Sequence, residues 1–140
     1  MRAILLIMIG LSSMLSADFT RDANGIVTDN TTGLAWQDNA IGSPATWQEA
    51  INRCEALSLG GEDDWRLPNL NELNSLVDDT KYNPIIDDVF QDYTASNIYW
   101  SSTTPAVGHI YVWTVDLSSG NQNVNDKNLN CYVRCVRAGR

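Results

Sequence analysis

The sequence predicts an α+β domain in which two helices pack on an antiparallel β-sheet. Two amphipathic segments with helix-capping signals occupy residues 46–77, and strand-like segments separated by turn residues follow from residue 98. Helices followed by a run of strands are typical of α+β proteins, whereas a parallel α/β sheet alternates strands with helices along the chain.

Residues 1–17 are typical of a secretory signal peptide. Arg2 precedes an uncharged run from Ala3 to Ala17, and its apolar core is too short to span a bilayer. We place cleavage after Ala17 because this puts a small residue at the cut. The protein is therefore expected to be exported, to the periplasm or outside the cell, with no membrane span. Residues 18–140 are expected to form a single domain.

The first elements are a hairpin and a helix. Strand-like residues 26–28 and 34–36 flank a turn-rich stretch and predict the hairpin. Thr46 can cap a helix with Glu49 as its capping-box partner, and Gly60-Gly61 is expected to end that helix. Its apolar face is expected to carry Trp47, Ala50, Ile51, Cys54 and Leu57.

A sharp corner precedes the second helix. Pro68 fixes its own φ and pushes Leu67 toward an extended conformation. Asn69 can then cap a helix over residues 70–77, with Glu72 completing the capping box. Trp65, placed just before this corner, is expected to be a core residue.

The C-terminal half is expected to form the rest of the sheet. Residues 81–96 predict a long ordered loop, and residues 98–102 predict a strand. An antiparallel meander is expected from residues 109–117, 122–126 and 130–137.

Five sequence blocks resemble, in order, the Lcl C-terminal domain family. This bacterial family is named for the end domain of a collagen-like adhesin that is associated with sulfated glycosaminoglycans. The resemblance implies a C-type-lectin-like fold and a cell-surface or secreted setting. The blocks are residues 32–37 (TGLAWQ), 45–50 (ATWQEA), 64–69 (DWRLPN), 99–103 (YWSST) and 132–137 (YVRCVR).

The same resemblance implies a disulfide between Cys54 and Cys135, because C-type-lectin-like folds tie the first helix to the final strand. An exported chain can hold such a bond. Cys131 shares a strand face with Cys135 and could compete for Cys54. It could also pair between chains, but we expect a buried free thiol.

Two short segments are also similar to formylglycine-generating enzymes. Those enzymes share the broader fold and use C-terminal cysteines in a copper-dependent oxidation. The similar segments are residues 66–68 and 134–136. An oxidase using Cys131 and Cys135 is therefore an alternative, although the expected disulfide would consume Cys135.

The charge of the chain limits its partners. The net charge is −8, and removal of the signal peptide with Arg2 would make it −9. Nucleic acid and broad attraction to sulfated glycans are therefore disfavoured. Arg134, Arg137 and Arg140 form a small basic cluster that we interpret as a solvated strand end.

Metal and hydrolytic sites have little support. Asp87, Asp88 and Asp92 cluster in the long loop, but the motifs of calcium-dependent lectins are absent, so a solvated acidic loop is expected. The single histidine, His109, is expected at the surface. No cofactor is expected.

These observations predict an exported, non-enzymatic recognition domain that binds a surface glycan or protein, as an adhesin does. A structural or assembly module is the alternative. The expected contact surface is an amide-rich hairpin, because amides donate and accept hydrogen bonds as sugar hydroxyls require. An exposed aromatic beside it, such as Tyr111 or Trp113, would favour glycan binding; a large apolar patch would favour assembly. Its predicted ligand-binding residues are Asn121, Asn123, Asn125, Asp126 and Lys127.

Overall fold

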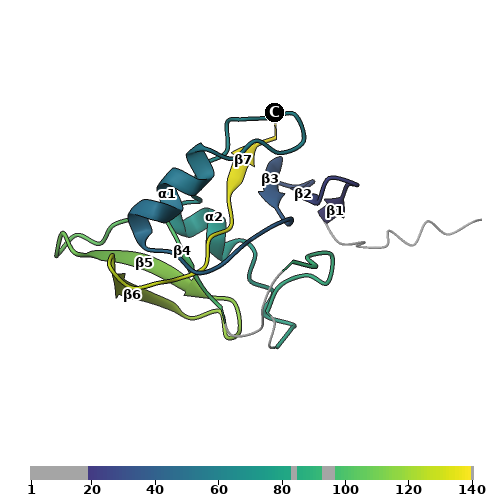
Figure 1. Cartoon of the computed structure of the whole chain (residues 1–140). Coiled ribbons are helices and arrows are strands. Elements are labelled where there is room, and N and C mark those ends of the chain that lie inside the picture. The colour runs from purple at the N-terminus through teal and green to yellow at the C-terminus, as the bar shows by residue number, and fades with distance from the viewer. Residues whose placement is uncertain (1–18, 83–84, 93–96, 140) are drawn as a thin grey trace, which may run out of the picture.

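The computed structural model describes residues 19–82, 85–92 and 97–139, which form an α+β domain (Figure 1). The expected signal peptide, residues 1–17, lies outside these residues, as do Arg140 and parts of the expected 81–96 loop. One antiparallel sheet has the order β1-β2-β3-β7, and the other has the order β4-β5-β6. Neither described helix has the length and hydropathy of a membrane-spanning segment.

The first sheet joins the two ends of the described chain. Its strands are β1 (Phe19–Arg21), β2 (Ile26–Asp29), β3 (Leu34–Gln37) and β7 (Val136–Ala138). The predicted hairpin is confirmed as β2 and β3, with Val27 opposite Trp36. Gly33 closes its turn with a φ of +78°, which side-chain-bearing residues rarely adopt.

The predicted meander is only partly correct. Strands β4 (Ile98–Trp100), β5 (Tyr111–Asp116) and β6 (Gln122–Asp126) form it. The last strand, however, pairs with β3, where Val136 lies opposite Trp36. The preceding residues cross between the sheets through isolated bridges at Cys131 and Tyr132, so they cannot extend the meander beyond β6.

Both predicted capping boxes are confirmed. Thr46 and Glu49 cap α1 (Trp47–Glu55), and Asn69 and Glu72 cap α2 (Leu70–Asn74). Both helices end earlier than expected. Gly60 and Gly61 do not end α1; they form a separate turn, closed by hydrogen bonds between Leu59 and Glu62.

The core occupies both faces of the β4-β5-β6 sheet. On one face, Trp100 and Val112 pack with Cys54 of α1 and with Trp65, whose predicted burial is confirmed at 2% exposure. On the other face, Tyr99 and Val115 pack with α2. Each helix therefore covers a different face of the same small sheet.

Arg134 was expected to be solvated, and this expectation is wrong. Its side chain is fully buried and forms an ion pair with buried Asp38, 2.8 Å from its Oδ1 atom. It also donates to the backbone oxygens of Gln37 and Asp92 and lies against the Phe90 ring. Burial lowers the pKa of Arg134, and nearby Tyr99 and Asp92 oppose that shift. The arginine thus ties the segment around Asp92 to the end of β3.

Candidate functional site

The cysteines are arranged as structural residues. Cys54 of α1 and Cys135 form a disulfide, as the resemblance implied. Cys131 is a buried free cysteine, which confirms that expectation. Burial raises the pKa of its thiol to about 11, and a hydrogen bond from Asn125 opposes the shift. A solvent-open pair of free thiols, which copper-dependent oxidation would need, is not formed by these cysteines.

The structure does not bring all the predicted hairpin residues to one surface. In a strand, side chains alternate between the two faces of the sheet. Asn121, Asn123, Asn125 and Lys127 therefore share the α1 side, while Asp126 faces the other way and lies opposite Tyr111. Asn125 donates inward to Thr114, whereas Asn121 and Asn123 are exposed.

An exposed aromatic does lie beside this hairpin. Tyr111 is 39% exposed, and the half-buried Trp113 follows it on the same face of β5. The side chain of Val124 on β6 lies directly opposite Trp113 and is 41% exposed. The outer face of this sheet therefore offers a small apolar surface at the end that α2 leaves open.

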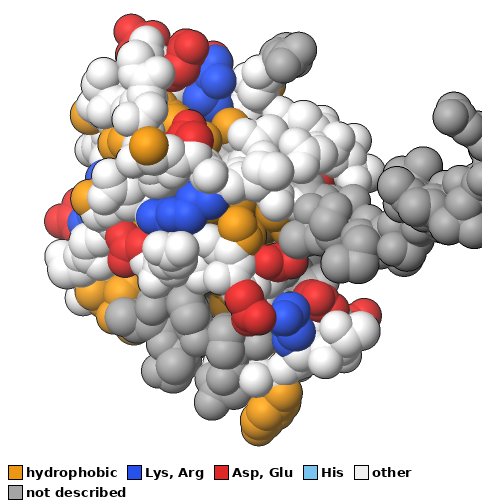
Figure 2. All heavy atoms as spheres, turned by 90° about the vertical axis from the view of Figure 1, so that its right-hand side faces the viewer, with side chains coloured by type: hydrophobic (Ala, Val, Ile, Leu, Met, Phe, Trp, Pro, Cys, Tyr) orange, Lys and Arg blue, Asp and Glu red, His pale blue; other side chains and the backbone are white. Residues whose placement is uncertain are grey.

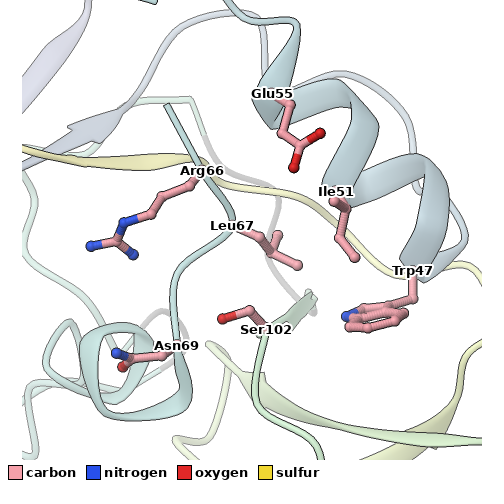
Figure 3. Close-up of a pocket in the computed structure, with 7 residues that line it drawn as sticks. All are labelled: Trp47, Ile51, Glu55, Arg66, Leu67, Asn69 and Ser102. Atoms are coloured by element: carbon pink, nitrogen blue, oxygen red, sulfur yellow. The ribbon is translucent and has the colours of Figure 1, made fainter. Parts of the chain in front are cut away.

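A pocket of about 420 Å³ lies between α1 and the corner before α2 (Figure 3). Trp47, Ile51 and Glu55 line it from α1, one helical turn apart, because i and i+4 side chains share a helix face. The opposite side is lined by Arg66, Leu67, Asn69 and Ser102.

Hydrogen bonds fix the aromatic wall of this pocket. The indole N–H of Trp47 donates to the backbone oxygen of Ser101 over 3.0 Å, which locks the ring in place. The Nζ atom of Lys127 lies 4.7 Å from the centre of the same indole. Lys127 is thus the one predicted hairpin residue that the structure places against the pocket wall.

The polar groups of the pocket differ in whether they have partners. Arg66 forms a bidentate ion pair with Glu72, at 2.6 and 2.7 Å. This pairing raises the pKa of Arg66 and lowers the pKa of the Glu72 carboxyl. By contrast, the side chains of Glu55 and Ser102 make no hydrogen bond with any described residue. They remain available to a ligand.

The acidic residues of the long loop have structural partners. Asp92 accepts from the backbone N–H of Ile41, and Asp88 forms an ion pair with Lys81. Among residues 19–82, 85–92 and 97–139, no three His, Cys, Asp or Glu side chains gather as a metal site. His109 is exposed just before β5, as expected.

The surface charges are mixed. Arg137 pairs with Asp64 and Glu62, so it does not form a free basic cluster with Arg134. On the face seen in Figure 2, each group of basic atoms lies beside acidic ones. That face offers no broad positive surface to a polyanion.

Residues 25–137 match the model of the Lcl C-terminal domain. The chain belongs to the Lcl C-terminal domain family. No curated protein matches the chain. Membership suggests an adhesin-like domain. The matched range includes every residue that lines the pocket.

Three of the sequence blocks that resembled the Lcl C-terminal domain family contribute residues to the pocket. Trp47 comes from the second block, Arg66, Leu67 and Asn69 come from the third, and Ser102 comes from the fourth. Sequence reasoning did not identify the pocket because these residues are far apart along the chain. Their shared presence in the matching blocks was the available signal.

Proposed function

We propose that this protein is an exported, non-enzymatic, adhesin-like recognition module of C-type-lectin-like fold, and that it binds an uncharged glycan in the Trp47 pocket. The observation that carries this proposal is that three of the sequence blocks resembling the family converge on one pocket. If this region had only a structural role, the pocket would not need the side chains of Glu55 and Ser102, which have no hydrogen-bond partner among the described residues.

The chemistry of the pocket suits a sugar ring. Trp47, Ile51 and Leu67 provide an apolar wall, and ligand sites combine such walls with a few well-placed polar groups. The Glu55 carboxylate can accept hydrogen bonds, and the Ser102 hydroxyl can donate and accept them. A sulfated glycan fits less well, because Arg66 already has its charge partner and the chain carries a net charge of −8.

The amide hairpin remains a second proposed surface for the same ligand class. Asn121 and Asn123 are exposed, and Tyr111 lies on the opposite face of the same two strands. A ligand at the hairpin would contact the two asparagines and not Glu55. The two surfaces can therefore be distinguished by mutation.

A glycan array on the purified protein, with and without calcium, tests the function. A hit is then titrated against Glu55→Gln and Ser102→Ala, with Asp63→Asn as the matched control at an exposed carboxylate outside the pocket. We expect Glu55→Gln to weaken binding by about tenfold or more, since a hydrogen bond to a charged group contributes about 1.5–3 kcal/mol, and Ser102→Ala to weaken it by a few-fold, since a neutral hydrogen bond contributes about 0.5–1.5 kcal/mol. The control should bind as the wild type does.

Other outcomes would refute the pocket. Loss of binding in Asn121→Ala and Asn123→Ala, with Glu55→Gln unaffected, would move the site to the hairpin. A preference for sulfated glycans with a steep salt dependence would contradict the uncharged ligand. Absence of any glycan hit would favour the assembly-module alternative.

A further inference from the structure

Strand β6 forms an open edge of its sheet, because β5 is its only neighbour in the order β4-β5-β6. Figure 1 shows it at the lower rim of the molecule. The backbone N–H of Asp116 donates to the backbone oxygen of Asn121, and the backbone N–H of Lys127 donates to that of Ile110, each over 2.8 Å. Since bonded pairs recur at every second residue of an antiparallel ladder, Asn123 and Asn125 also bond toward β5.

The backbone groups of the other three residues therefore point away from the sheet. These residues are Gln122, Val124 and Asp126. Gln122 and Val124 form no backbone hydrogen bond with any other described residue, whereas the backbone oxygen of Asp126 accepts from the N–H of Leu129 over 2.9 Å. An unpaired row of N–H and C=O groups is a template for another strand.

This edge lacks the usual protection against pairing. Natural edge strands are blunted by lysine, proline or a bulge. Residues 122–126 contain neither lysine nor proline, their one charged side chain is Asp126 at the end of the strand, and they pair with β5 in an unbroken register. Their side chains are mostly amides, with the 41%-exposed Val124 at the centre.

We propose that β6 pairs with β6 of a second copy of this chain, antiparallel, across a two-fold axis at Val124. The two small sheets then form one continuous sheet. Val124 lies opposite Val124 of the other copy, and Gln122 lies opposite Asp126. Each such pair exchanges two backbone hydrogen bonds, in which the Asp126 oxygen, already an acceptor from Leu129, uses its second lone pair.

The charge pattern favours this register over an axis at Asp126. In the Val124-centred register, the carboxylate of Asp126 faces an amide. An axis at Asp126 would instead place two carboxylates opposite each other, which is destabilising. A two-fold interface requires that each strand complement itself, and the sequence QNVND does so through its Gln–Asp and Asn–Asn pairs.

The net charge of −8 on each copy opposes association. Salt screens this repulsion, whereas it does not abolish backbone hydrogen bonds. The dimer should therefore be favoured by higher ionic strength.

Sedimentation velocity of the purified protein over a concentration series, at low and high salt, measures this association. We expect a monomer–dimer equilibrium that Val124→Pro weakens by about tenfold or more. Proline is suited to the test because the Val124 N–H does not bond to β5, so the internal ladder is retained. Val107→Ala, which alters an 80%-exposed apolar residue elsewhere, is the control and should dimerise normally.

Cysteine cross-linking tests the register. Cα atoms in a bonded antiparallel pair are about 5.5 Å apart, which a disulfide can bridge. Val124→Cys should therefore cross-link under mild oxidation. Asn121→Cys should not, because residue 121 faces residue 127 of the other copy and the two introduced thiols lie about 20 Å apart at ~3.4 Å per residue.

Four results would overturn the proposal. They are a monomer at every concentration, a dimer unaffected by Val124→Pro, equal cross-linking of the two cysteine variants, and open-ended filaments in place of a closed dimer. Circular dichroism of each variant establishes that it is folded, and Val124→Lys replaces the proline variant if that one is not.

Discussion

Asp38→Asn is the most informative test of the core. The Asp38 carboxylate is fully buried and accepts from Arg134 at 2.8 Å. It also accepts from the backbone N–H groups of Gln91 and Asp92, at 2.8 and 3.1 Å. Arg21 is a further ion-pair partner. The substitution keeps the shape but leaves Arg134 charged, buried and without its ion-pair partner.

The size of the effect follows from this geometry. Removing one partner of a buried ion pair costs about 3–5 kcal/mol, because the remaining charge is uncompensated. The new amide group must also face one of the two backbone N–H donors, and two donors cannot bond to each other. We therefore expect a loss near the upper end of that range.

Asp29→Asn is the matched control. Asp29 is 5% exposed and accepts from the backbone N–H groups of Thr31 and Thr32, both at Oδ1. The asparagine keeps that oxygen, and no arginine loses its ion-pair partner. The expected loss in the free energy of unfolding is therefore about 1 kcal/mol.

Urea unfolding followed by tryptophan fluorescence measures both losses. The double variant Asp38→Asn with Arg134→Met should lose less stability than the sum of the two single losses, because it also removes the buried arginine charge that has no partner. A loss in Asp38→Asn within about 1 kcal/mol of the Asp29→Asn loss would refute the reasoning.

Three further predictions concern the cysteines and the corner. Replacing Cys54 and Cys135 by serine releases a link over 81 residues and should cost about 4.5 kcal/mol in the chain-entropy model; a loss below about 1 kcal/mol in urea unfolding would contradict it. Cys131, with its pKa raised to about 11, should resist iodoacetamide at about pH 8 in the folded protein and react in urea, as mass spectrometry will show. Arg66 lowers the pKa of Glu72 below its ordinary 4.5, so this ion pair stabilises the fold above about that pH and is lost as pH falls through the lowered value. Glu72→Gln should accordingly reduce the acid-induced loss of stability, by under about 1 kcal/mol because Arg66 is 45% exposed.

Local signals in the sequence predicted the local structure well. Both capping boxes depend on hydrogen bonds between residues three apart, such as Asn69 and Glu72, so the sequence contains the whole motif. The partner of the last strand depends instead on residues about 100 positions away. No local pattern distinguishes pairing with β6 from the observed pairing with β3.

The burial of Arg134 could not be predicted from the neighbouring sequence either. An arginine in a strand is usually solvated. Its burial depends on Asp38, which lies 96 residues earlier in the chain. Nothing near Arg134 in the sequence indicates that a carboxylate will meet it.

The candidate site was predicted less completely than the fold. The amide-rich strand was found from composition, but its division between two faces follows from strand alternation, which places Asp126 apart from Asn123 and Asn125. The Trp47 pocket could not be found from composition, because it draws its walls from three separate segments. Trp47 was expected on the buried apolar face of its helix, and its half-buried position as the first residue of α1 is what makes it a pocket wall.

The two proposed surfaces are independent in their geometry. Lys127 directly follows β6, and its Nζ atom lies over the Trp47 ring, so its side chain is on the pocket side of the sheet. The outward backbone groups belong to residues 122, 124 and 126, whose side chains lie on the opposite face. Pairing at β6 should therefore leave the pocket open, and a dimer would present two pockets to one surface.

This separation makes a joint test possible. Val124→Pro should leave the affinity for a soluble monovalent glycan unchanged, while it reduces binding to an immobilised glycan, where two linked pockets gain from effective concentration. Glu55→Gln should have the opposite pattern of effects: it should weaken binding of the monovalent glycan in the pocket while the protein still dimerises. A variant at β6 that weakens monovalent binding as much as Glu55→Gln does would show that strand pairing and ligand binding share one site.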